Sequence, residues 1–271
     1  MLNPVTRALI TNDDGIDSVG LRYLVEELST REFEVYVVAP RSQVSGAAKS
    51  NSFRVKVTPV KLEGTKGAWA IDGKPADAVA IALKALLPEK PDIVISGINI
   101  GPNMGITDFF TSGTIGAAIE AALLGVRAVA SSYAVLRGIG EDDKPHIRKA
   151  AMITAEVAER LSRNPRAPEG LDIVLLNFPR GNPRGVRIAS MALISNIEIY
   201  NGEEEGVYHV LGWRTDNLDE AYTGEQEGTD VDLVKKGYVA VTPICLKCLT
   251  EATSNAALTA GLITLLRDLL G

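Results

Sequence analysis

The chain has 271 residues, 46% hydrophobic and 23% charged, and its 25 Gly and 13 Pro are dispersed. This composition excludes disordered, collagen-like and low-complexity chains. The 28 basic and 34 acidic residues leave a net charge of −6, which argues against a nucleic-acid polymer as partner. The first residues lack the apolar core of a signal peptide, and Glu120 and Arg127 interrupt the most apolar stretch, residues 116–136. We therefore expect a cytoplasmic protein without membrane contact.

Short apolar runs alternate with helical periodicity in the first half of the chain. Residues 8–11 predict a strand, and Leu21, Leu24, Val25 and Leu28 follow at helical spacing. The same alternation predicts strands at residues 35–38, 93–95 and 126–130, helices at 78–83 and 114–124, and a hairpin at 53–60 and 68–71. Strands this apolar are buried on both faces, which favours a doubly wound, mostly parallel α/β sheet with helices on each side.

The rhythm changes in the second half. A helix is predicted at residues 147–161, followed by a strand at 173–176. Next comes an antiparallel excursion, with strands at 187–189, 197–200 and 208–211 and an exposed arm over 201–228. A strand at 238–241 and a helix at 254–270 complete the prediction. We therefore expect a catalytic core over residues 1–185. Residues 186–271 then form the excursion, return to the sheet and end in the C-terminal helix.

The only two cysteines, Cys245 and Cys248, are separated by two residues. A redox pair and half of a zinc site are both compatible with this spacing, but the two histidines, His146 and His209, do not complete a zinc-ligand pattern. No strand–helix redox context precedes the pair. We therefore interpret both cysteines as small apolar residues.

Polar segments follow three of the predicted strands. They are residues 12–15, 39–46 and 96–99. In an open parallel sheet ligands bind beyond the carboxyl ends of the strands, so these loops are expected to share one crevice. Turn formation and helix capping are the competing interpretation of the first loop.

Two adjacent carboxylates, Asp13 and Asp14, repel each other, and a shared divalent cation is the simplest relief. With the hydroxyl of Ser45 and the amide oxygen of Asn99 they form an all-oxygen set. Such a set favours Mg²⁺, Mn²⁺ or Ca²⁺ over zinc. Asp13 and Asp14 are also the candidate catalytic residues, since a metal there would activate water.

A candidate phosphate site follows the third loop. Ser112, Gly113 and Thr114 open an apolar helix, and the glycine-rich segment 101–105 precedes them. Backbone N–H groups at a helix start, together with hydroxyls, bind phosphate well, although an ordinary Ser/Thr cap would have the same sequence. A cation beside a phosphate site is what phosphoester hydrolysis requires. The chain has neither a P-loop nor a Gly-x-Gly-x-x-Gly turn, and it lacks the acid spacing of an aspartyl-phosphate phosphatase.

Four ordered motifs together are far more specific than any one of them. They are Thr11–Ile16, Ala39–Pro40 with Ser45–Gly46, Ser96–Asn103 and Ser112–Thr114. With them the chain resembles the stationary-phase survival protein SurE family of metal-dependent 5′-nucleotidases. The similarity resumes at residues 176–179, 228–231 and 237–243.

The resemblance implies a Rossmann-like fold that hydrolyses nucleoside monophosphates (5′ or 3′) and other phosphate esters. It also implies one divalent cation per subunit and a homodimer or homotetramer with exchanged C-terminal segments. The implied metal ligands are Asp13, Asp14, Ser45 and Asn99, and the implied phosphate-binding residues are Asn103, Ser112, Gly113 and Thr114. A regulatory module that binds metal and nucleotide without turnover is the alternative function.

Departures from the family pattern concern residues 106–111, Lys49 and Lys74. We interpret Lys49 as a solvated loop lysine and Asp77 as part of a helix start. The aromatic residues of the excursion, which could stack a base, are better explained as subunit contacts. They are Tyr200, Tyr208, Trp213 and Tyr222.

Overall fold

The computed structural model describes residues 6–164, 168–194, 200–201, 204–209, 215–224 and 226–251. The strands are β1 Thr6–Thr11, β2 Phe33–Pro40, β3 Lys56–Val60, β4 Gly67–Asp72, β5 Ile93–Ile100, β6 Ala128–Ala134, β7 Ile173–Pro179, β8 Val186–Ile188, β9 Tyr200–Asn201, β10 Tyr208–His209 and β11 Val239–Ile244. The α-helices are α1 Val19–Ser29, α2 Pro75–Ile81, α3 Gly105–Thr111, α4 Gly113–Leu123, α5 Lys144–Arg163, α6 Leu218–Ala221, α7 Asp230–Lys235 and α8 Leu246–Glu251. A π-helical turn, Ala82–Leu86, extends α2, and a 3₁₀ turn, Glu141–Asp143, precedes α5.

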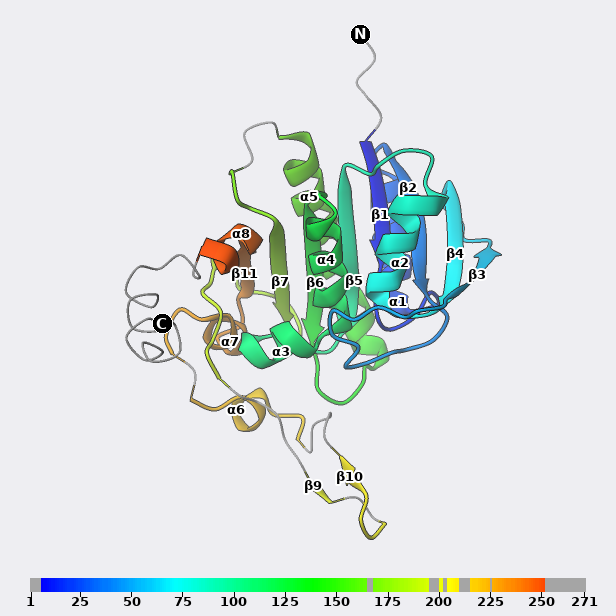
Figure 1. Cartoon of the computed structure of the whole chain (residues 1–271). Coiled ribbons are helices and arrows are strands. Elements are labelled where there is room, and N and C mark those ends of the chain that lie inside the picture. The colour runs from blue at the N-terminus through cyan, green and yellow to red at the C-terminus, as the bar shows by residue number, and fades with distance from the viewer. Residues whose placement is uncertain are drawn as a thin grey trace, which may run out of the picture.

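Within these residues nine strands form one sheet in the order β3-β4-β2-β1-β5-β6-β7-β11-β8. The run from β4 to β7 is parallel throughout, whereas β3 pairs antiparallel with β4, and β11 antiparallel with β7. Helices α1 and α5 contact each other over one face of the sheet, and α2 and α4 over the other (Figure 1). The expected doubly wound, mostly parallel α/β fold is confirmed.

The helices follow the apolar periodicity of the sequence. Leu21, Leu24, Val25 and Leu28 are all buried on the inner face of α1, because residues three and four apart share one side of a helix.

Asp77 lies in the first turn of α2, where its Oδ2 accepts the N–H of Lys74 at 2.9 Å. The prediction that Asp77 belongs to a helix start is therefore confirmed.

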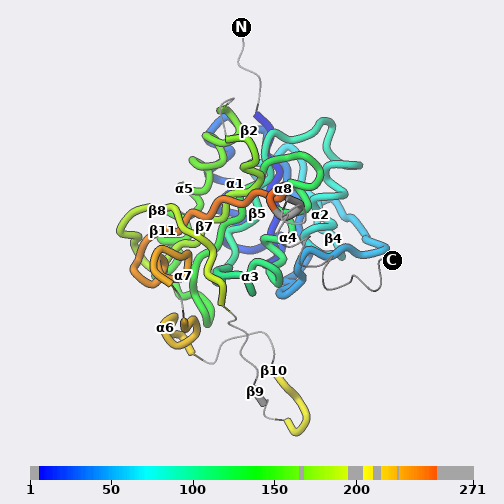
Figure 2. Tube along the Cα trace, turned by 60° about the vertical axis from the view of Figure 1, so that its left-hand side comes forward, coloured from blue at the N-terminus to red at the C-terminus, as the bar shows by residue number. Residues whose placement is uncertain are grey.

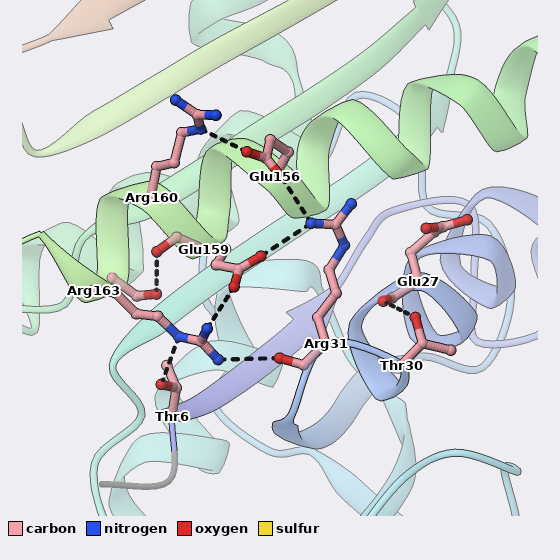
Figure 3. Close-up of polar contacts among 9 residues, drawn as sticks. Thr6, Glu27, Thr30, Arg31, Glu156, Glu159, Arg160 and Arg163 are labelled. Carbon is pink, nitrogen blue, oxygen red and sulfur yellow. Dashed lines mark hydrogen bonds and ion pairs between the residues drawn. The ribbon is translucent and has the colours of Figure 1, made fainter. Parts of the chain in front are cut away.

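The two helices on the first face are joined by a network of ion pairs near the amino ends of the strands (Figure 3). Arg31, which follows α1, contacts Glu156 of α5 at 2.8 Å and Glu159 at 3.0 Å. Arg160 contacts Glu156, and Arg163 contacts Glu159, each one helical turn along α5. Each of the two glutamates therefore has two arginine partners.

The second half differs from the prediction in one respect. The antiparallel excursion is present as the β9–β10 ladder, which stands away from the main sheet in both views (Figure 1 and Figure 2). Residues 187–189 do not begin it, because β8 pairs in parallel with β11 at the sheet edge. The helix expected at residues 254–270 lies outside the described residues. No helix in the described ranges is long and apolar enough to span a membrane.

Cys245 and Cys248 form a disulfide between the end of β11 and the start of α8. The interpretation of both as unlinked apolar residues is therefore wrong. Both lie at the surface, Cys245 half-buried and Cys248 exposed, where apolar packing has little influence on a thiol. Their spacing brings the two Cα atoms to 5.4 Å, which is within the usual range for a disulfide.

Candidate active site

The candidate residues of the first three loops meet at the carboxyl ends of β1, β2 and β5, the edge of the sheet near α3 in Figure 1. Val44, next to Ser45, donates its N–H to the backbone oxygen of Asp13 at 2.8 Å. Ile100, next to Asn99, donates its N–H to Oδ2 of Asp14 at 2.8 Å. The loop after β1 is therefore fastened to both neighbouring strand ends.

The turn after β1 is formed by Asn12 rather than by either aspartate. Its buried Oδ1 accepts the N–H of Gly15 at 3.1 Å, and its Nδ2 donates to Ser18 Oγ at 2.6 Å. This is the turn chemistry that competed as an explanation of the whole motif. Since Asn12 performs it, the turn does not require the carboxylates of Asp13 and Asp14.

Asp13 is buried against the start of α4. It is 6% exposed, and Thr114 donates to it twice, through its N–H at 3.1 Å and through its hydroxyl. Gly113 makes this approach possible, because a Cβ there would lie 2.9 Å from both Cβ and Oδ2 of Asp13. Burial raises the pKa of Asp13, and the bonds from Thr114 partly oppose that shift.

Asp14 lies beside it and is half-buried. Burial and then the negative charge of Asp13 raise the pKa of Asp14 from 3.8 to about 7, against the opposing effect of the Ile100 N–H. None of the ion pairs formed by the described side chains involves either aspartate. Two neighbouring carboxylates thus share a site in which no described basic side chain forms an ion pair with them.

The donors present fit a hard divalent cation. The described residues contain no group of three or more His, Cys, Asp or Glu that could hold a metal, so a cation here would rely on hydroxyl and amide oxygens beside the two aspartates. Ser45 is exposed and follows Val44, whose N–H binds the Asp13 backbone oxygen, and Asn99 is half-buried. Asn99 donates Nδ2 to the Gly101 oxygen at 3.0 Å, which uses its nitrogen and leaves its oxygen as the ligand atom.

The loop that carries Ser45 is held against α4. Ala48 donates its N–H to the Thr111 oxygen at 2.9 Å, and a Cβ on Gly116 would lie 2.2 Å from the Ala48 oxygen. Lys49 Nζ lies 2.6 Å from Oε2 of Glu120, a buried residue of α4. The interpretation of Lys49 as a solvated lysine is therefore wrong, because the burial of Glu120 leaves its charge in need of a partner.

Asn99 does not follow its strand as expected but lies within it, since β5 continues to Ile100. The β5–β6 ladder shifts register between Ser96 and Asn99, after which Asn99 pairs with Ser132. Ser132 in turn pairs with Asn177 of β7. A row of polar residues therefore crosses three strands at the carboxyl edge.

The candidate phosphate residues have partners of their own in the protein. Ser112 caps α4 by accepting the Ile115 N–H at 3.1 Å, so its own hydroxyl proton can still be donated outward. Thr114 is turned toward Asp13. Asn103 is 8% exposed and donates Nδ2 to Ser132 Oγ at 2.8 Å. Their contact with phosphate stays a prediction.

Sequence reasoning gave no role to Asn177, which holds Asn103 through two hydrogen bonds. A signal was present, because a lone amide directly after the apolar run 173–176 must find partners when it is buried.

The sequence-based prediction for Tyr222 was wrong. This residue is fully buried within its own subunit, where its hydroxyl donates to Asp108 Oδ2 at 2.6 Å. A subunit contact is thereby excluded for Tyr222.

For the other aromatic residues of the excursion, the expected subunit contact stays a prediction. Tyr208 is 62% exposed. Trp213 and the side chain of Tyr200 lie outside the described part of the chain.

Comparisons with known proteins agree with the motifs. The 5′-nucleotidase SurE of Desulforamulus reducens is 36% identical over 248 residues, which cover 89% of this chain and 92% of that protein. The 5′-nucleotidase SurE of Methanothermobacter thermautotrophicus is 43% identical over 182 residues, 64% of this chain and 68% of that protein. The crystal structure of the Sure protein from Aquifex aeolicus matches with a TM-score of 0.72 at 26% identity, covering 93% of this chain and 99% of that one. A family model described as Survival protein SurE matches residues 8–198, and the chain belongs to that family.

Proposed function

We propose that this protein is a 5′-nucleotidase, a hydrolase that releases inorganic phosphate from nucleoside monophosphates and other phosphate monoesters with the help of a divalent cation. The observation that carries the proposal is the pair of neighbouring carboxylates Asp13, which is buried against the start of α4, and Asp14, which is half-buried; neither forms an ion pair with a described basic residue. The relatives named 5′-nucleotidase SurE support the same reaction.

Asp13, Asp14, Ser45 and Asn99 would hold the cation, with Mg²⁺ or Mn²⁺ favoured and Ca²⁺ also compatible with oxygen ligands. When bound, such a cation polarises a phosphoryl oxygen and lowers the pKa of a water molecule. Thr114 keeps the Asp13 carboxylate in place through its two hydrogen bonds. The Ile100 N–H does the same for Asp14.

The substrate phosphate would lie beside these carboxylates and next to Ser112 at the start of α4, because Asp13 itself is in direct contact with Thr114. Ser112 donates its hydroxyl proton, and Asn103 the second N–H of its amide, to phosphate oxygens. The helix start adds partial positive charge that stabilises the negative charge of the transition state. With the phosphate fixed in this way, water attacks in line with the leaving oxygen, and no protein nucleophile is needed.

The test is phosphate release from several nucleoside monophosphates and an aryl phosphate, measured after chelation and after return of Mg²⁺, Mn²⁺ or Ca²⁺. We expect release that requires the returned metal and is lost in Asp14→Asn. The matched control is Glu159→Gln, which removes a charge from α5 at the other edge of the sheet. Nucleotide binding without release by the wild-type protein would instead identify a regulatory module.

We further propose a homodimer or homotetramer located in the cytoplasm. The family resemblance supports the assembly, and the exposed apolar residues Ile188 and Leu193 supply a surface that a second copy could cover. Light scattering of the purified protein measures the assembly size, and a monomer at micromolar concentration would refute this part of the proposal.

A further inference from the structure

Two motifs in the second half of the chain have no role in the proposed function so far. They are residues 176–179 at the end of β7 and residues 228–231 at the start of α7. In the structure both reach the segment Gly101–Gly105, which connects β5 with α3 and carries Asn103. Asn177 contacts the middle of this segment, and Asp230 contacts its end.

Asn177 holds the backbone of Asn103 on both sides. Its Oδ1 accepts the Asn103 N–H at 3.1 Å, and its Nδ2 donates to the Asn103 oxygen at 2.9 Å. Asn177 is 1% exposed and Asn103 is 8% exposed. Because water does not reach these groups freely, a rotation of Asn103 would leave a buried donor or acceptor without a partner.

The side chain of Asn103 is fixed separately. Its Nδ2 donates to Oγ of Ser132, which is 2% exposed and lies in register with Asn177 on the next strand. A primary amide has two N–H donors, so one donor of Asn103 remains after this bond. The direction of that donor is set by Ser132 through the side chain and by Asn177 through the backbone.

Asp230 fixes the other end of the segment. Its carboxylate, 1% exposed, accepts the Gly105 N–H at 2.8 Å and the Ala192 N–H at 2.9 Å. Asn177 therefore anchors Asn103 itself, and Asp230 anchors the segment two residues further along, at Gly105.

We propose that Asn177 is a positioning residue that presents the amide of Asn103 to the substrate phosphate, with Asp230 as the second anchor of the same segment. This inference rests on the proposed function. A donor held in advance needs no reorganisation when the anion arrives, so its contribution to binding is larger than that of a mobile amide. Since the contact is with phosphate, its loss affects all phosphate monoesters equally, whatever base or leaving group they carry.

The primary variant is Asn177→Leu, which keeps the branching at Cγ and removes both hydrogen bonds, and Asn177→Ala is a second variant that leaves room for water. KM and kcat are measured for a nucleoside monophosphate and an aryl phosphate, and Kd for inorganic phosphate by calorimetry, all with saturating Mg²⁺. We expect KM and Kd to rise about 10- to 100-fold, by the same factor for both substrates. Thr242→Val is the matched control, since this buried hydroxyl of adjacent β11 has no described hydrogen-bond partner.

A double-mutant cycle separates positioning from a general structural role. If Asn177 acts through the Asn103 amide, Asn177→Leu raises KM less than about threefold further in an Asn103→Ala background. A full additional loss there would overturn the proposal, and so would unchanged KM and Kd in a folded Asn177→Leu or Asn177→Ala protein. If the wild-type protein binds phosphate but hydrolyses no nucleotide, the proposed function fails while the Kd comparison still decides the role of Asn177. A wild-type protein that binds no phosphate overturns both.

Discussion

Acidic side chains at the two edges of the sheet have opposite surroundings. At the amino edge Glu156 and Glu159 each contact two arginines (Figure 3), which lowers the pKa of Glu156. At the carboxyl edge Asp13 and Asp14 have only hydrogen-bond donors, and their pKa values are raised. The network at the amino edge joins α1 to α5. The pair at the carboxyl edge leaves its negative charge to be balanced by a ligand, which is the arrangement expected of a functional site.

The largest expected effect of this contrast is a variant, Asp14→Asn, that loses activity while the protein becomes more stable. Asp14→Asn should lower phosphate release about 100- to 1,000-fold, because it removes a charged ligand of the proposed cation. The same change should raise the Tm of the chelator-treated protein, because it removes a half-buried charge that Asp13 repels. Phosphate release and thermal unfolding measure the two effects. In Glu159→Gln, phosphate release should stay within about twofold of wild type; a lower Tm for Asp14→Asn after chelation would contradict the contrast.

The contact between Asp13 and α4 provides the second prediction. Gly113→Ala improves helix propensity but places a Cβ 2.9 Å from two atoms of Asp13. We expect the overlap to dominate and to lower the free energy of unfolding by about 1–3 kcal/mol, with a loss of activity as Asp13 moves. Urea unfolding and phosphate release measure both effects. A more stable and fully active variant would show that Asp13 does not depend on this close packing.

The ion pair under the Ser45 loop should have a smaller effect. Lys49→Met leaves the charge of Glu120 buried without its partner. We expect a loss of about 1–2 kcal/mol, below the roughly 3–5 kcal/mol of fully buried pairs, because the Lys49 side chain is 31% exposed. The double variant with Glu120→Gln should recover much of this loss in urea unfolding. If the double variant is no more stable than Lys49→Met, the ion pair between Lys49 and Glu120 does not contribute to the free energy of unfolding.

The smallest effect concerns pH at the amino edge. The pKa of Glu156 is lowered by hydrogen bonds from Arg160 and Arg31, so ionised Glu156 stabilises the folded chain at pH values above its unfolded pKa. This contribution disappears as the pH falls through the lower folded pKa. The Tm difference between wild type and Glu156→Gln, followed from pH 7 down to pH 3, should therefore shrink toward zero. A difference that grows on acidification would refute the assignment.

The sequence alone predicted most of the strands and helices in the first half, although not α3, and it predicted that three polar loops share one edge of the sheet. Apolar runs such as residues 35–38 are long enough to identify buried strands, and polar residues such as Asp13 stand out at their ends. These are local patterns, because strand and helix periodicity depend on neighbouring residues. The competing interpretation of the first loop as a turn was half right, since Asn12 forms the turn and the aspartates do not.

Only the tertiary structure decided which distant residues meet. Nothing near Asn103 in the sequence indicates Asn177, 74 residues away, or that Asp230 holds Gly105. Likewise, Lys49 became an ion-pair partner and Tyr222 a core residue through contacts with α4 and α3. The physical reason is that a buried polar group must be satisfied by whichever group the fold brings within about 3 Å. Sequence periodicity shows that such a partner is needed, while the packing of the strands and helices determines which residue it is.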